Sequence, residues 1–212
     1  MFLCLDIGFM LLHVAYIANV LHAKVFLVST ERGYAEIFQY TKMMLAALIM
    51  LYLYIRTKAS LRLMLGLLFV YFFIDDSVGI HERTDTWLSP LIQMPHISWL
   101  LPADVWQVAT GITLGMIALL AIGYCYKRCQ IAGLKRRARL AVICILALGI
   151  FAVFVDALHA TFRDVGWLDP ILALIEDGGE MIAVTGALTV FFDDLIGQWY
   201  PSGANQRSVI VH

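Results

Sequence analysis

The chain has 212 residues, of which 61% are hydrophobic and 15% are charged, and its mean hydropathy is +0.82. A soluble domain of this size needs more polar surface than these residues supply, so the composition indicates an integral membrane protein. The formal net charge of −1 gives no support for a nucleic-acid partner.

Apolar stretches long enough to cross a bilayer recur along the chain. A helix needs about 20 mainly apolar residues to cross the hydrocarbon core, and six stretches reach that length, at residues 2–22, 35–55, 60–82, 103–126, 138–162 and 170–198. The first resembles a secretory signal, but Asp6 stands where a signal carries basic residues, so we expect a retained helix. The sequence therefore predicts an all-α, polytopic membrane bundle over residues 1–199, followed by a short cytoplasmic tail at 200–212.

Basic residues are distributed unevenly among the connections. The connections between the second and third and between the fourth and fifth stretches contain Arg56, Lys58, Arg62, Lys127, Arg128, Lys135, Arg136, Arg137 and Arg139. The other connections contain Lys24, Arg32, Arg83 and Arg163. Because cytoplasmic connections carry the excess of Lys and Arg, we expect both termini in the cytoplasm. The four cysteines then lie toward the reducing side, and no disulfide is expected.

Ionisable residues gather at one end of three of the predicted helices. With the expected topology, stretches 60–82 and 138–162 run outward and stretch 170–198 runs inward. Each then brings acids or imidazoles to the outer leaflet, and the residues concerned are Asp75, Asp76, His81, Glu82, Asp156, His159, Glu176, Asp177 and Glu180. A charge in hydrocarbon costs ~2.5–3.5 kcal/mol on insertion scales, so these groups must face one another, water or an ion.

The spacing of these residues favours a metal site. Asp156 and His159 are three residues apart and Glu176 and Glu180 are four apart, so each pair projects from one helix face. Facing helices that present carboxylates and a carboxylate-x-x-His pair are typical of dinuclear metal bundles, although those bundles use two such pairs. We therefore predict that the nine residues bind a divalent metal ion, and oxygen-rich ligands favour iron, manganese or zinc over copper.

Two other interpretations of the acidic residues remain open. They could form a purely structural network, in which Asp76 pairs with Arg83, Asp156 or His159 pairs with Arg163, and Lys42 neutralises a further carboxylate. They could also form part of a proton or cation pathway. The inner half of the predicted bundle is poor in polar residues, and this favours a site over a pore.

Three further features have both structural and functional interpretations. Gly111 and Gly115 form a Gly-x-x-x-Gly pattern that suits close packing within the chain or a homo-oligomer face. His13 is either a satisfied core residue or a functional group. The connection at 84–103, rich in Trp and Pro, could lie over the acidic residues as a lid or serve as an interfacial aromatic belt.

The segments "DDSVGIHE", "DALH" and "EDGGEM" together resemble a group of bacterial multi-pass membrane proteins with Asp-Asp-x4-His-Glu, Asp-x-x-His and Glu-Asp-Gly-x-Glu motifs. The resemblance implies a bacterial cytoplasmic (inner) membrane location and a common site for these motifs, but no reaction. We therefore expect either a metal-dependent hydrolase or oxidoreductase acting on a lipid-like molecule, or a proton- or cation-coupled transporter, or an accessory subunit with a structural polar cluster. The bilayer is the expected partner in each case.

Overall fold

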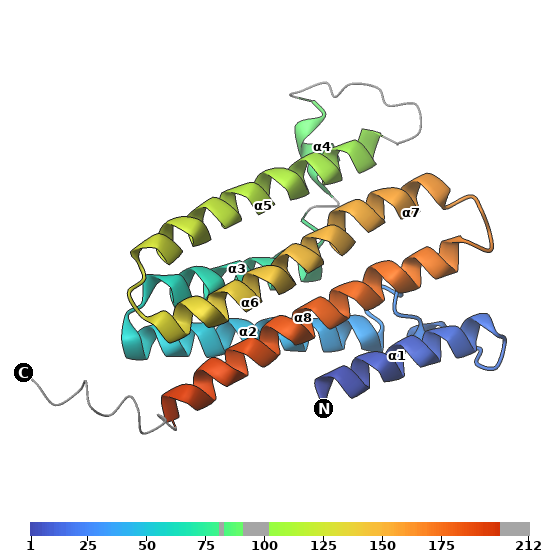
Figure 1. The fold of residues 1–212 in the computed structure, drawn as a ribbon. Helices are drawn as coiled ribbons and strands as arrows, with labels where there is room; N and C mark the ends of the chain where they lie inside the picture. The colour runs from blue at the N-terminus through green and yellow to red at the C-terminus, as the bar shows by residue number, and fades with distance from the viewer. Residues whose placement is uncertain (81–82, 91–101, 200–212) are drawn as a thin grey trace, which may run out of the picture.

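The computed structural model describes residues 1–80, 83–90 and 102–199, and every regular element in these ranges is helical. In chain order the elements are α1 (Phe2–Ile17), the 3-10 helix η1 (Lys24–Phe26), α2 (Tyr34–Thr57), α3 (Ser60–Val78), α4 (Thr84–Leu88), α5 (Pro102–Arg128), α6 (Ala132–Gly149), the π-helical segment η3 (Ile150–Val155), α7 (Asp156–Phe162) and α8 (Asp169–Trp199). The long helices run alongside one another as a bundle (Figure 1). The predicted all-α fold is confirmed.

Three helical segments within the described ranges are long and apolar enough to cross a membrane by length and composition, namely Tyr34–Thr57, Ala103–Arg128 and Ala132–Phe162. They correspond to the predicted stretches 35–55, 103–126 and 138–162. The other three stretches also contain helices, but α1 ends at Ile17 instead of residue 22 and α3 ends at Val78 instead of residue 82. The predicted tail at 200–212 lies outside the described residues.

Gly79 explains where α3 ends. It adopts a left-handed conformation with φ 65°, and its backbone N–H donates to the carbonyl of Asp75. Glycine reaches this conformation without steric cost, so it commonly stands just after the last helical residue. The helix therefore ends shortly after Asp75 and Asp76, which remain in its last turn.

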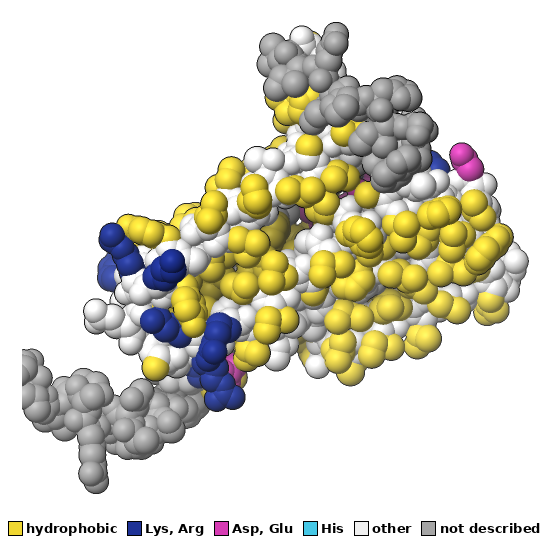
Figure 2. Space-filling view, turned by 45° about the horizontal axis from the view of Figure 1, so that its top comes forward, with side chains coloured by type: hydrophobic (Ala, Val, Ile, Leu, Met, Phe, Trp, Pro, Cys, Tyr) yellow, Lys and Arg dark blue, Asp and Glu magenta, His cyan; other side chains and the backbone are white. Residues whose placement is uncertain are grey.

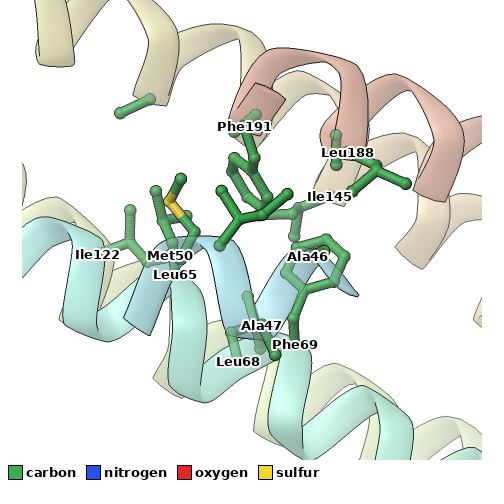
Figure 3. Packing of buried hydrophobic residues seen from close by; sticks show 14 of the residues in the cluster. Ala46, Ala47, Met50, Leu65, Leu68, Phe69, Ile122, Ile145, Leu188 and Phe191 are labelled. Carbon is green, nitrogen blue, oxygen red and sulfur yellow. The ribbon is translucent and has the colours of Figure 1, made fainter. Parts of the chain in front are cut away.

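The apolar core lies where α2, α3, α6 and α8 meet. Alanines such as Ala46 on α2 and Ala141 on α6 are fully buried, and such small residues let the helix backbones approach closely. Phe69 of α3 and Phe191 of α8 fill the space between them, with ring centroids 5.2 Å apart and planes at 80° (Figure 3). Close packing of this kind holds the four helices together where lipid offers no competing hydrophobic drive.

Two buried ion pairs join helices that are distant in sequence. Lys42 Nζ of α2 donates to Asp6 Oδ1 of α1 at 2.6 Å and to the Met181 carbonyl of α8 at 2.8 Å. Arg62 of α3 donates to both carboxylate oxygens of Asp194 on α8, at 2.8 and 2.9 Å. The sequence-based suggestion that Lys42 neutralises one of the outer acids is therefore wrong, because its ammonium group is paired with Asp6.

The outward faces of the bundle are apolar and its charges lie at its ends. Leu11 of α1, Leu120 of α5 and Phe154 of η3 each expose more than half of their surface. Figure 2 shows hydrophobic side chains covering the flank of the molecule, with Lys and Arg side chains gathered at the end where α5 turns into α6. This separation of charge matches the arrangement expected for a bundle surrounded by lipid.

Candidate functional site

A cavity of about 1250 Å³ runs between α2, α3, α5, the continuous helix formed by α6, η3 and α7, and α8. Seven of the nine predicted site residues line it. They are Asp75 and Asp76 from α3, Asp156 and His159 from α7, and Glu176, Asp177 and Glu180 from α8. The remaining two, His81 and Glu82, lie outside the described residues. The structure thus brings the ionisable residues of three separate helices to one cavity.

The carboxylates in this cavity lie near one another. Asp76, Asp156, Glu176 and Asp177 all lie close enough to Glu180 to interact with it electrostatically. Glu176 and Asp156 are within hydrogen-bonding contact. Two carboxylates this close repel each other unless a proton or a cation compensates their charge.

The charge on the cavity wall is strongly one-sided. Its acidic lining residues are Glu31, Glu36, Asp75, Asp76, Asp156, Asp169, Glu176, Asp177 and Glu180, and among the described residues Arg163 is the only Lys or Arg in the lining. Arg163 Nη2 donates to Asp104 Oδ1 at 3.3 Å, so the suggested pairing of Arg163 with Asp156 or His159 is not the one the structure shows. The cavity therefore presents an excess of negative charge to any molecule or ion inside it.

His159 is held between two carboxylates. Its Nδ1 lies 2.6 Å from Glu176 Oε2 and its Nε2 lies 3.0 Å from Asp169 Oδ1. Since both ring nitrogens face carboxylate oxygens, neither directs a lone pair into the cavity. In this arrangement His159 orients Glu176 and shares protons with its neighbours.

The metal-ligand geometry differs from the sequence-based expectation. Within residues 1–80, 83–90 and 102–199, no three His, Cys, Asp or Glu side chains are arranged as a group that could hold a metal ion. The carboxylates converge on the cavity without closing into a coordination sphere. Closing it would require side-chain rotations or ligands from elsewhere in the chain.

Helix α2 contributes residues that the sequence did not single out. Glu36, Gln39 and Met43 follow one another at helical spacing and all line the cavity. The Glu36 carboxylate accepts hydrogen bonds from the Arg32 backbone N–H and the Tyr40 hydroxyl, which fixes its position. The spacing of Glu36 and Gln39 on one face of a predicted helix was the available signal, but neither belongs to a recognisable motif.

Gln39 stands out because its amide is buried and unpaired. The residue is 5% exposed, and neither Nε2 nor Oε1 has a hydrogen-bond partner among the described residues. Buried side-chain amides are nearly always paired, because an unpaired one costs about 1–3 kcal/mol. This side chain therefore marks a point in the cavity where a polar guest fits.

The other half of the cavity is apolar. Its walls include Ile112 and Met116 of α5 and Phe154 and Leu158 of the facing helix, which also expose part of their surface on the outside of the bundle. The cavity thus reaches the apolar flank of the molecule between α5 and the α6–η3–α7 helix. A molecule with an apolar chain could enter from the bilayer between these two helices.

The glycines of the predicted packing motifs lie next to side chains of the same protein. A methyl group added at Gly111 would lie 2.8 Å from Cγ2 of Val153, whereas none of the described atoms lies within 4 Å of the same point on Gly115. Gly178 faces Met10 of α1, and the Phe151 ring of η3 lies directly against Gly179. Gly111 and Gly179 therefore seat η3 between α5 and α8, beside the carboxylates.

His13 has a structural role in this arrangement. Its Nδ1 accepts the Val28 backbone N–H at 3.2 Å, so its Nε2 carries the hydrogen and donates to the Pro170 carbonyl at 3.1 Å. These bonds join α1, the connection to α2 and the start of α8. Of the predicted lid at 84–103, the structure describes α4, and residues 91–101 lie outside the described ranges.

Comparison with known proteins identifies the family and gives no activity. No curated protein and no solved structure matches the chain. A family model described as a domain of unknown function, DUF8692, matches residues 11–195. That range contains the whole cavity lining, and the chain therefore belongs to the DUF8692 family.

Proposed function

We propose that this protein crosses the bacterial inner membrane six times, binds a divalent metal ion among the carboxylates of its cavity, and acts on a lipid-like molecule bound in the apolar half. The observation that carries the proposal is the cavity itself, which joins a carboxylate-rich region to an apolar region that reaches the flank of the bundle. An amphiphile would place its polar end at the acids and its chain between α5 and α7.

The proposed topology has both termini in the cytoplasm and the acidic end of the cavity near the outer face. Support comes from the basic residues gathered at the α5–α6 end of the bundle, opposite the end where His159 and Asp169 lie (Figure 2). Helices α1, α3 and α8 would complete the six spans. Their charged residues would be tolerated because the buried ion pairs and the cavity shield them from lipid.

Support for a bound cation comes from the charge of the cavity. Nine acidic side chains and one arginine line it, and closely spaced carboxylates need compensation. A divalent metal ion supplies that charge and can polarise a substrate or lower the pKa of a bound water. A carboxylate outside the coordination sphere could then serve as general base. Hydrolysis and oxidation–reduction of a lipid-like substrate are both compatible with this arrangement.

The test is the metal content of the purified protein. We expect about one or two equivalents of iron, manganese or zinc in the wild type, and loss of that metal in Glu180→Gln and in His159→Ala, because one removes a donor and the other releases Glu176. Gln198→Met, on the exposed end of α8, serves as the control and keeps its metal. A protein that takes up no divalent cation would overturn the proposal. If the two variants were also as stable as the wild type, the result would favour an accessory subunit.

Proton-coupled transport is the second candidate, and His159 favours it. A histidine held between Glu176 and Asp169 can pass a proton from one carboxylate to the other. In proteoliposomes with an entrapped pH-sensitive dye, a transporter would carry protons across the membrane, and His159→Gln would stop this flux. The metal-site proposal expects no flux above that of empty liposomes.

A further inference from the structure

Gln39 is the most deeply buried unpaired polar group that the described residues contain. Its side chain lies on the α2 wall of the cavity, between Glu36 one turn before it and Met43 one turn after it. Glu36 is already engaged by Arg32 and Tyr40, and none of the described groups pairs with the Gln39 amide. Retaining an unpaired amide here lowers the stability of the empty protein.

The neighbours of Gln39 in the cavity define what would pair with it. Asp177 and Glu180 of α8 and Asp76 of α3 line the same cavity, and they offer only acceptor oxygens when ionised. A cation among these groups could take the Gln39 amide oxygen as a ligand. The amide N–H₂ would remain free to donate to a neighbouring carboxylate and hold it in place.

We propose that Gln39 is a ligand of the bound cation through Oε1, together with carboxylates of Asp177 and Glu180, and that His159 is a positioning residue that orients Glu176. This inference rests on the proposed function and narrows its cofactor. The described donors are then all oxygens. Carboxylate and carbonyl oxygens suit hard divalent ions such as Mn²⁺ and Mg²⁺.

Titration of the metal-free protein with Mn²⁺, followed by the electron paramagnetic resonance signal of the unbound ion, measures this contribution. We expect Gln39→Met to weaken Mn²⁺ binding about 10-fold or more, since it removes an oxygen donor. Gln39→Glu restores an oxygen and adds a charge, so it should bind at least as tightly as the wild type. Gln198→Met makes the same chemical change on the exposed end of α8 and should leave the affinity unchanged.

Thermal unfolding of the same metal-free variants separates a ligand from an ordinary core residue. Gln39→Met removes an unpaired amide from an apolar surrounding, so the empty variant should be at least as stable as the wild type. A variant that is stable yet binds Mn²⁺ weakly identifies Gln39 as a binding residue. If Gln39→Met unfolds, a Gln39→Glu protein with less than one tenth of the wild-type affinity would equally overturn the inference.

The two proposals fail in different ways. Wild-type protein that binds no Mn²⁺, iron or zinc would overturn the proposed function. Wild-type protein that binds Mn²⁺ while Gln39→Met binds it equally well would overturn the role of Gln39 and leave the metal site in place.

Discussion

At the scale of single residues, the charges of this protein fall into two kinds. Asp6, Lys42, Arg62 and Asp194 are each at most 1% exposed and are bonded to one another in pairs. The carboxylates of the cavity instead share a common space with few cations. The first kind holds helices together, and the second is available to a guest.

The adjacent residues Asp193 and Asp194 allow a matched test of the structural charges. Asp194→Asn would leave the Arg62 guanidinium buried without its counter-ion, so we expect it to lower the free energy of unfolding by about 3–5 kcal/mol. Asp193 pairs with Arg137 at the surface and is 68% exposed, so Asp193→Asn should cost less than about 1 kcal/mol. Chemical unfolding in detergent micelles measures both. Equal losses in the two variants would contradict the burial-based argument.

The site residues could be predicted from the sequence in part, for a physical reason. An acid in an apolar helix is expensive, so Asp156, Glu176 and Glu180 were conspicuous. Gln39 was not, because a glutamine in a helix attracts no attention until its burial and missing partners are known. The pairing of Lys42 with Asp6 could not be predicted, because helix periodicity does not say which helices are neighbours.

At the scale of elements, η3 shapes the middle of the site. The helix from 132 to 162 becomes π-helical at Ile150–Val155, just before Asp156, and its Phe151 ring packs on Gly179 of α8. Such π-helical segments often occur at functional sites, where they redirect the side chains that follow. Here the segment immediately precedes Asp156 and His159, which face the cavity.

Gly179→Ala tests this contact. The added methyl group would collide with the Phe151 ring, so we expect a loss of about 1–3 kcal/mol in stability. Replacing Phe151 by Leu in the same protein should recover part of the loss. Gly115→Ala is the control, because the described atoms leave open space there, and its melting temperature should stay within about a degree or two of the wild type. A Gly179→Ala protein as stable as the wild type would show that η3 does not pack as described.

Helix ends illustrate what the sequence pattern leaves undetermined at this scale. Hydropathy predicted a helix through residue 82, whereas Gly79 ends α3 at Val78. The hydropathy of a stretch does not register the one glycine that takes a left-handed conformation. The type and order of the long helices, in contrast, followed from apolar length alone.

At the scale of the whole molecule, the proposed topology places the two ends of the bundle on opposite sides of the membrane. Ala23, between α1 and α2, and Gln130, between α5 and α6, are both exposed and lie in connections of opposite predicted sidedness. In a protein whose native cysteines are replaced by serine, we expect Ala23→Cys to react with a membrane-impermeant maleimide added to intact cells. Gln130→Cys should react only after the cells are opened. The reverse pattern would invert the topology and move the acidic cavity to the cytoplasmic side.

The bundle as a whole was predictable because composition forces an all-helical membrane fold. The cavity was not predictable in detail. Its volume, its opening between α5 and α7 and its contribution from α2 depend on how the helices pack, which no local pattern encodes. The family assignment spans the same residues without specifying a reaction.

The central claim is that carboxylates from separate helices share one bound cation. Anomalous X-ray scattering from crystals of the protein soaked in Mn²⁺ tests it most directly. We expect a single strong peak inside the cavity, within about 2.0–2.6 Å of carboxylate oxygens of Asp177 and Glu180. A protein whose cavity shows no manganese peak at saturating Mn²⁺, or whose peak lies outside the cavity, would contradict the account.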